Sequence, residues 1–400
     1  MVPGLRKEFN SKFSQEKYRR QISDLEHRCG CNIEFRIAET PLFLTRGMAS
    51  KAGKLAEEIL IRAASPELQE IGKKAIPDNY NVADETPLPL FAAVDFAITG
   101  SRENPEFKLI ELQGFPSLYH YQSVFSESMR EIYGLPQDLN GLIDPSLGVK
   151  QYHDILKQAI LGDCDPHETV LLEIDPMNQK TKCDFILARK HLGIHIVDIC
   201  SVISQGNELF HPDHEGNLIR IKRIYNRAIA DELIRKNITL RFDIAESYDV
   251  QWAGHPNWYF RISKVLLPHL VGTNDAVPKA WYISDADHKH LDLSQFVLKP
   301  LYSFAGLGVN VSPTLSDIEA IPETDRDKWL LQEKVDYADI ITTPDGNAVR
   351  GELRVMLIWP EGGKAPQALH TLVRLTRGKM VGVDYNKGLD WVGSSCALVA

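Results

Sequence analysis

The residues of this sequence best suited to chemistry lie between positions 294 and 310. A short apolar run, Phe-Val-Leu, is typical of a β-strand and places Lys299 at its end, where Pro300 stops further pairing. Gly306 and Gly308 follow, and glycine permits the positive φ that lets backbone N–H groups approach an anion. Glycines after a strand also form ordinary turns. With that alternative open, the pattern predicts a phosphate-binding loop beside a lysine.

Two flanking segments could complete such a site. Upstream, residues 258–270 have helical periodicity around Lys264, although a lysine on a helix is usually only solvated. Downstream, residues 329–335 (Trp-Leu-Leu-Gln-Glu-Lys-Val) predict an apolar strand that runs into polar residues. The segment therefore offers a second lysine and a polar strand end on either side of the glycine loop.

A second group of chemically suitable residues lies in a predicted β-hairpin between positions 88 and 121. Asp95 interrupts its first strand, and Glu111 and Gln113 share one face of the return strand because side chains alternate. A carboxylate within such apolar strands needs a cation, a metal ion or a hydrogen-bond donor. Magnesium takes few carboxylates and completes its shell with phosphate and water, which fits these three side chains. A salt-bridged pair on a half-exposed hairpin is the alternative.

Together these motifs resemble the ATP-grasp superfamily. Its members hold phosphates with two lysines and a glycine loop, bind adenine at a strand end, and carry a metal hairpin with an Asp strand followed by a Glu-x-Asn strand. Here Gln113 stands in place of the Asn. Because the hairpin precedes the glycine loop in this chain, the order resembles that of circularly permuted members, of the glutathionylspermidine synthase type. The resemblance covers residues 88–375.

The resemblance implies a role for each candidate residue. The phosphates of ATP would be held by two lysines and two glycines, namely Lys264, Lys299, Gly306 and Gly308. Adenine would be bound at the strand end by Gln332, Glu333 and Val335. Mg²⁺ would be bound by Asp95, Glu111 and Gln113. Arg354 would offset phosphate charge during transfer, unless it only forms a surface pair with Glu352. The hairpin and the glycine loop would then face each other across one triphosphate pocket.

A second metal-binding set stays open near the end of the sequence. Arg374, Asp384 and Asn386 could form the metal strands of an unpermuted ATP-grasp domain, with Asp-x-Asn in place of Glu-x-Asn. Asp384, however, lies between Gly382 and Gly388, a composition that is typical of a turn. We favour the earlier hairpin because it supplies all three ligands on paired strands.

The reaction implied by the resemblance is ATP-dependent formation of an amide or peptide bond between a carboxylate and an amine. The γ-phosphoryl group passes to the carboxylate and the amine attacks the acylphosphate, so the chemistry needs positioning and electrostatics but no covalent nucleophile. Small-molecule or peptide acids and amines would be the substrates, with ATP and Mg²⁺ as cofactors. Two alternatives stay open. One is a noncatalytic ATP-binding sensor or scaffold, which Gln113 and the Ala93 at an expected arginine position favour; the other is an ATP-grasp phosphotransferase.

The elements around these motifs predict an α/β (α+β) fold. Residues 168–174 and 194–199 are strand-like and residues 182–192 helical, which implies a right-handed crossover between parallel strands. This unit resembles the substrate-side subdomain of ATP-grasp proteins. It also carries Arg223 and Arg227, which form either a clamp for a substrate carboxylate or, as we favour, a solvated strand edge.

We expect four segments in this α/β arrangement. They are an N-terminal helical segment (1–80) with helices at 11–30 and 47–75, a metal-hairpin segment (81–150), the substrate-side subdomain (151–245) and the ATP-binding ATP-grasp subdomains (246–400). The N-terminal helices could pack on the core or on a second subunit, so a homodimer stays possible.

Composition limits the function classes. A net charge of -9 argues against nonspecific binding of nucleic acid, so any phosphate site must be local. The six cysteines are dispersed without the spacing of a zinc ribbon and predict reduced thiols. We find neither a signal-peptide core nor a membrane-spanning run, and therefore expect a cytoplasmic protein with no membrane partner.

Overall fold

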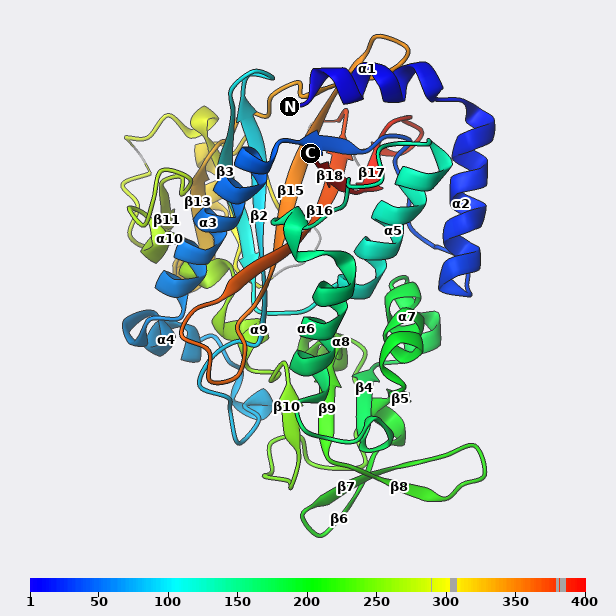
Figure 1. Cartoon of the computed structure of the whole chain (residues 1–400). Coiled ribbons are helices and arrows are strands. Elements are labelled where there is room, and N and C mark those ends of the chain that lie inside the picture. Colours follow the sequence, from blue (N-terminus) through cyan, green and yellow to red (C-terminus); the bar gives the residue numbers. More distant parts are fainter. Residues whose placement is uncertain (289, 303–307, 379–380, 382–385) are drawn as a thin grey trace.

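The fold is built around an antiparallel central sheet in the order β17-β16-β15-β2-β3, with β14 paired to β15 (Figure 1). The computed structural model describes residues 1–288, 290–302, 308–378, 381 and 386–400. The strands of the central sheet are β2 (Phe91–Gly100), β3 (Pro105–Gln113), β14 (Ile341–Thr342), β15 (Ala348–Ile358), β16 (Gln367–Thr376) and β17 (Gly393–Ser395).

Apolar cores cover both faces of this sheet. Alternate residues of β2, among them Val94 and Phe96, pack in one core with helix α3 (Arg46–Ala63). Phe91 belongs to a second core that contains helix α5 (Tyr119–Ile132). Because both faces are covered, β2 is buried at every residue but its last, and its sequence is apolar on both faces except at Asp95 and Thr99.

The predicted hairpin is confirmed as β2 and β3, and it contains a β-bulge. Asp95 lies opposite Glu111, but the next residue, Phe96, lies opposite Leu109, so that Ile110 is the extra residue. A bulge bends its strand and frees backbone groups from the ladder. Here the bulge lies at the chemically important end of the hairpin.

A small antiparallel sheet, in the order β11-β13-β12, lies beside the β3 edge of the central sheet (Figure 1). Its strands are β11 (Ala280–Tyr282), β12 (Phe296–Pro300) and β13 (Trp329–Glu333). The strands predicted before Lys299 and at residues 329–335 are therefore confirmed, and they pair with each other.

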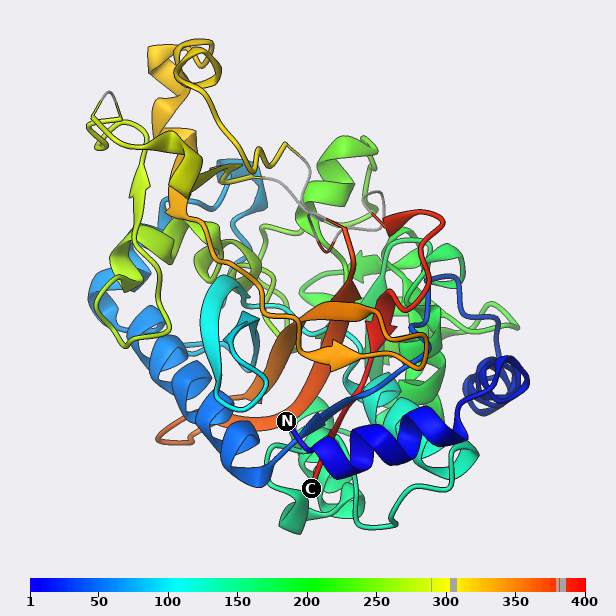
Figure 2. The ribbon, with the colours of Figure 1, turned by 90° about the horizontal axis from the view of Figure 1, so that it is seen from above.

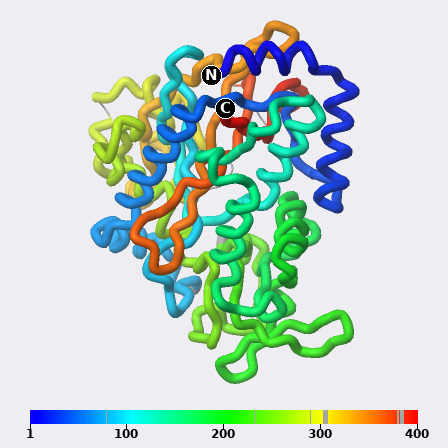
Figure 3. The backbone as a smooth tube through the Cα atoms, viewed as in Figure 1, coloured from blue at the N-terminus to red at the C-terminus, as the bar shows by residue number. Residues whose placement is uncertain are grey.

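The crossover unit predicted from the sequence is confirmed in its elements. Strand β4 (Thr169–Glu173), helix α7 (Lys182–Leu192) and strand β5 (His195–Asp198) follow one another, and β4 pairs with β5 in parallel. The strands β9 (Arg223–Asn226) and β10 (Gln251–Ala253) complete a four-stranded parallel sheet with its own apolar core. A three-stranded antiparallel sheet projects from this end of the molecule (Figure 3), formed by β6 (Ile203–Gln205), β7 (Glu208–Pro212) and β8 (Leu218–Ile221).

Of the two predicted N-terminal helices, one is confirmed and the other is divided into two helices. The helix predicted at 11–30 is α2 (Gln15–Cys29), and Gly30 ends it with φ of 73°. The pattern at 47–75 forms two helices, α3 and α4 (Pro66–Lys73), because a proline opens a helix easily but cannot continue one.

The remaining elements connect these layers. Strand β1 (Leu42–Leu44) pairs in parallel with β18 (Ala397–Val399), and the two ends of the chain lie close together (Figure 2). The other α-helices are α1 (Pro3–Lys12), α6 (Val149–Leu161), α8 (Ala230–Arg235), α9 (Trp258–Arg261), α10 (Leu267–Leu270) and α11 (Leu315–Glu319). Among the helices described, none combines the length and the apolar character that a membrane crossing requires.

The continuous helix expected at residues 258–270 is wrong. The segment instead forms α9, a single 3₁₀ turn at Lys264–Leu266 and α10. Ile262 and Ser263 interrupt the helix, with φ of -108° and -151°.

Candidate functional site

Lys299, at the end of β12, lies against the bulge of the central hairpin. Its Nζ donates to Gln332 Oε1 at 2.5 Å and to the carbonyl oxygen of Ile110 at 3.2 Å. Gln332 Nε2 in turn donates to the carbonyl oxygen of Leu109 at 3.1 Å. The bulge thus presents two carbonyl groups on which the small sheet docks. The predicted closeness of the hairpin to Lys299 is confirmed.

The two predicted phosphate-binding lysines share a charged neighbourhood. Burial lowers the pKa of Lys299 to about 8; Glu111 and Glu352 oppose this shift, and Lys264 adds to it. Burial also lowers the pKa of Lys264, again against the effect of Glu111. Lys264 is only 7% exposed. An anion beside these lysines would favour their charged forms and is therefore the ligand that the site suits.

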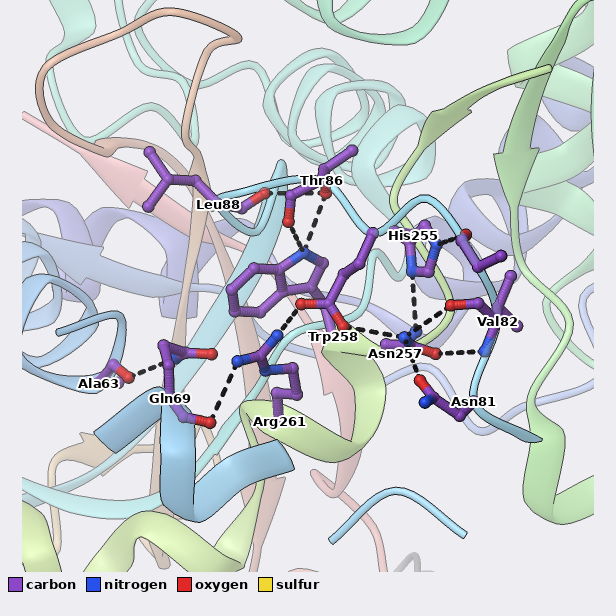
Figure 4. Close-up of polar contacts among 12 residues, drawn as sticks. Ala63, Gln69, Asn81, Val82, Thr86, Leu88, His255, Asn257, Trp258 and Arg261 are labelled. Carbon is purple, nitrogen blue, oxygen red and sulfur yellow. Dashed lines mark hydrogen bonds and ion pairs between the residues drawn. The ribbon is translucent and has the colours of Figure 1, made fainter. Parts of the chain in front are cut away.

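Polar contacts hold the segment that delivers Lys264 (Figure 4). Asn257 Nδ2 donates to the carbonyl oxygen of Val82 at 3.0 Å, and its Oδ1 accepts from the Val82 N–H at 3.0 Å. Trp258 Nε1 donates to Thr86 Oγ1 at 2.9 Å. These bonds fix α9 on the chain that leads into β2, so Lys264 is positioned by tertiary contacts and not by a long helix.

A cavity of about 390 Å³, here called cavity A, is lined by β12, β13, β15 and the chain after β13. The predicted adenine-binding residues Gln332, Glu333 and Val335 line it together with Lys299. Gly308 has φ of 74°, as predicted for the glycine loop, and the nearby Val309 and Val311 line the cavity. Gly306 lies outside the described residues.

Asp95, predicted as a metal ligand, is held by two arginines from neighbouring strands. Its Oδ1 accepts from Arg354 Nε at 2.6 Å and its Oδ2 from Arg354 Nη2 at 2.8 Å. Arg374 Nη2 also pairs with Oδ2. Burial alone would raise the pKa of Asp95, but the two guanidinium groups outweigh burial and lower it. Strands β2, β15 and β16 are adjacent, which is why these three side chains meet.

Arg374 extends the network toward cavity A. The same Nη2 lies 2.8 Å from Glu352 Oε2, and the Tyr337 hydroxyl donates to Glu352 Oε1. Glu352 and Tyr337 line cavity A. Burial would lower the pKa of Arg374, but Asp95, Glu352 and Glu111 together raise it. Arg374 is therefore positively charged and lies close to these three carboxylates.

A second cavity of about 660 Å³, here called cavity B, lies on the other side of this network. Arg354 and Arg374 line it, and Val381 lines both cavities. Its wall carries apolar side chains such as Leu118 and Leu372. Leu118 has φ of 62°, a strained value for a bulky residue, as is often found at functional sites.

The predicted metal set is only partly available in this arrangement. The arginines occupy both oxygens of Asp95, and Gln113, with its amide oriented to match its neighbours, accepts from Arg354 Nη2 at 2.5 Å. Glu111 remains beside the lysines. In the described part of the chain, no group of three or more His, Cys, Asp or Glu side chains is arranged to hold a metal ion. Metal binding by this set stays a prediction.

The alternative metal set has a structural role in part. Asn386 Oδ1 accepts from Thr376 Oγ1 at 2.9 Å and from the N–H groups of Arg377 and Gly378, each at 3.2 Å. Three donors saturate this oxygen, so Asn386 closes the turn after β16. Asp384 lies outside the described residues.

Arg223, in β9, and Arg227, directly after it, do not form the solvated strand edge that we favoured from the sequence, so that interpretation is wrong. Arg223 is 1% exposed and donates to the backbone of α6 at Ile160, 2.8 Å away. Arg227 is 3% exposed and lies 5.1 Å from the ring centroid of Phe115 and 3.7 Å from Asp184. Arg223 has a packing role, and Arg227 joins the parallel-sheet unit to the chain after the hairpin.

Sequence reasoning missed two features of the site. It gave Glu352 no role beyond a possible pair with Arg354, yet Glu352 lines cavity A and pairs with Arg374. It also placed Arg354 with the phosphates, whereas Arg354 lines cavity B. The only available signal was the alternation on β15, which puts both side chains on one face but does not identify their partners.

No protein-family model matches the sequence, and no curated protein matches it either. Among solved structures, the fold is similar to that of a glutathione synthetase like-effector (GSS30) from Globodera pallida in its apo form. The TM-score is 0.58 at 12% sequence identity, and the match covers 97% of this chain and 98% of that one. At this identity the likeness shows the fold alone: the chain has a mixed α+β fold like that of a glutathione synthetase-like protein.

Proposed function

We propose that this protein is an ATP-grasp ligase that uses ATP to join a carboxylic acid to an amine through an acylphosphate. The observation that carries the proposal is that two cavities with different lining residues adjoin each other. Cavity A carries Lys299 and the strand end of β13, cavity B carries two arginines, and Val381 lines both. The fold shared with a glutathione synthetase-like protein supports this reading.

Cavity A suits ATP. Lys299 provides a positive charge in a partly buried position. Two of its three N–H donors bond to Gln332 and Ile110, so the third is available to a phosphate oxygen. Lys264 adds a second positive charge near Glu111. Glu333 and Val335, for which the resemblance implies adenine binding, line the same cavity as Lys299.

The donors present fit Mg²⁺. Glu352 lines cavity A and Glu111 lies near both lysines, so two carboxylates are available, and Mg²⁺ commonly takes one or two with phosphate and water completing its shell. Bound there, Mg²⁺ would offset charge on the transferred phosphoryl group. We propose Glu111 and Glu352 as the ligands, with Asp95 and Gln113 committed to Arg354.

Cavity B suits the acid substrate. In the proposed reaction a carboxylate oxygen attacks the γ-phosphorus and ADP leaves with the bonding electrons. The amine then attacks the acyl carbon, a C–N bond forms, phosphate departs with the electrons of the broken C–O bond, and the amine loses a proton. Arg374 lies between Glu352 and cavity B, so it can offset charge on the oxygens shared by acid and phosphate. Arg354 orients the acid.

A noncatalytic nucleotide-binding protein is the second candidate. The observation that favours it is the commitment of Asp95 and Gln113 to Arg354, which leaves one of the three predicted metal ligands in reach of the lysines. Release of ADP separates the two candidates. Steady ADP formation that depends on an added acid and amine supports the ligase, whereas tight binding of ATP without acid-dependent turnover supports the binding protein.

Lys299→Ala tests the nucleotide site directly. The variant loses a charged hydrogen-bond donor, so we expect the affinity for Mg²⁺ and a nonhydrolysable ATP analogue to fall by about 10- to 100-fold in titration calorimetry. Lys328→Ala is the matched control, since this lysine is exposed and pairs with Asp325 just before β13. Unchanged affinity in Lys299→Ala, with the protein folded, would contradict the proposal.

A further inference from the structure

Five side chains form a continuous polar chain from one cavity to the other. It runs from Tyr337 through Glu352, Arg374 and Asp95 to Arg354. The first two line cavity A, the last lines cavity B, and Arg374 lies between Glu352 and Asp95 while lining cavity B. A change at Glu352 in cavity A must therefore alter the surroundings of Arg374 in cavity B.

The two arginines of this chain are held very differently. Arg354 is 12% exposed; two of its nitrogens bond to Asp95, and the amide of Gln113 accepts from the same guanidinium. Arg374 is 36% exposed and makes both of its ion pairs through Nη2, while its Nε has no partner among the described residues. Arg354 is thus held by several contacts, whereas the Arg374 side chain can rotate if it loses its ion pair with one of its two carboxylates.

Glu352 is the carboxylate whose ion pair with Arg374 a bound nucleotide would weaken. Its Oε1 accepts from Tyr337, and its Oε2 holds Arg374 at 2.8 Å. A divalent cation carried with the nucleotide competes for that same oxygen and weakens its attraction for Arg374. Asp95 is 1% exposed and keeps the other pair with Arg374, so the guanidinium stays at the junction, where Arg374 lines cavity B.

We propose that Arg374 couples the two cavities: a nucleotide–cation complex in cavity A engages Glu352 and releases Arg374 to receive the carboxylate of the acid in cavity B. Asp95 is the positioning residue that keeps Arg374 at the junction, and not a metal ligand. The proposal rests on the proposed function. It has a consequence for affinity: the bound nucleotide strengthens binding of the acid, and by linkage the acid strengthens binding of the nucleotide by the same factor.

Chemical labelling of arginine tests the release step. The protein is treated with phenylglyoxal, with and without saturating Mg²⁺ and ADP, and modified peptides are quantified by mass spectrometry. ADP is used because it lacks the γ-phosphoryl group that could itself cover Arg374. We expect labelling of Arg374 to rise about tenfold with Mg²⁺ and ADP, within the usual range of coupling between sites, while Arg354 stays weakly labelled.

One variant and one control arginine sharpen this test. In Glu352→Gln the partner of Arg374 is neutral, so Arg374 should label strongly even without nucleotide. Arg28 is the control, since it also bridges carboxylates (Asp24, Glu127 and Glu131) but lines neither cavity, and its labelling should not respond to Mg²⁺ and ADP. Unchanged labelling of Arg374 in protein that binds Mg²⁺ and ADP overturns the coupling but leaves the proposed function standing. Failure of the nucleotide to bind overturns both.

The role of Asp95 is tested by the Mg²⁺ dependence of ADP binding. For Asp95→Asn we expect the Mg²⁺ concentration that gives half-maximal binding to change less than about twofold, whereas loss of one of the few charged ligands of Mg²⁺ should shift it by about tenfold or more. Because this change leaves buried arginines uncompensated and can unfold the protein, the double variant Asp95→Leu with Arg354→Leu is measured beside it, since apolar replacement of both members of a buried pair is often tolerated. A tenfold shift in a folded variant would show that Asp95 is a metal ligand.

Discussion

At the scale of single residues, Lys299 decides how the nucleotide site depends on pH. Burial brings its pKa to about 8, well below the usual value for lysine. In the unfolded chain the same lysine would have a pKa near 10.4. Between these values the folded state binds fewer protons than the unfolded state, so this group makes the free protein more stable as pH rises through that window.

Nucleotide binding should reverse this shift. A phosphate beside Lys299 favours the charged amine and raises its pKa, so binding takes up a proton above pH 8, and affinity falls as pH rises further. Below about pH 7 the amine is already charged and no uptake is expected. Titration calorimetry in buffers of different ionisation enthalpy measures the uptake. Lys299→Ala should show a smaller uptake, because Lys264 is the other lysine of the site whose pKa burial lowers; uptake equal to that of the parent would assign the effect to another group.

At the scale of elements, close backbone contact positions the turns that carry Lys264. Gly114 follows the hairpin directly, and its N–H donates to the carbonyl oxygen of Ile262 at 2.9 Å. A Cβ at this glycine would lie 2.4 Å from the carbonyl oxygen of Trp258. Only glycine therefore allows α9 and the end of β3 to approach as closely as they do.

Gly114→Ala should separate these elements. The added methyl group meets backbone, which yields only by moving α9, so we expect a loss of stability of about 1–3 kcal/mol in chemical denaturation and weaker nucleotide binding. Gly4→Ala is the control, because a Cβ there meets nothing within 4 Å and lies in helix α1. A Gly114→Ala protein as stable as the parent would show that the segment adapts without cost.

At the scale of the whole molecule, a buried carboxylate joins the parallel-sheet unit to the central sheet. Asp184 of α7 accepts from the N–H groups of His120 and Tyr121, at 2.8 and 2.9 Å, and thereby closes the first turn of α5. Arg227, at the end of β9, lies 3.7 Å from its other oxygen. Three elements from two layers therefore depend on one side chain that is fully buried.

Asp184→Ala should loosen this junction. The variant leaves Arg227 buried without its carboxylate and removes the cap of α5, so we expect a loss of about 3–5 kcal/mol in the free energy of unfolding. The matched control is Asp154→Ala, which breaks an exposed pair with Lys150 on α6 and should cost less than about 0.5 kcal/mol. Equal losses in both variants would contradict the role of Asp184.

Much of the local structure was predictable because its causes are local. The apolar runs and periodic spacing that predict the hairpin around Asp95, the helix at 182–192 and the strand before Lys299 are properties of neighbouring residues, and each element is confirmed. The helix around Lys264 was not predictable, since its interruption depends on contacts with Val82 and Thr86, far away in the sequence.

The sequence by itself determined which residues carry charge and which strands present them: Lys299 after its apolar run, and Asp95 and Glu111 on paired strands. Only the tertiary structure decided their partners. Adjacent strands bring Arg354 and Arg374 to Asp95, although they are separated from it by more than half of the chain. A carboxylate takes whichever cation packing brings closest, and strand order in a sheet cannot be derived from the alternation within any one strand.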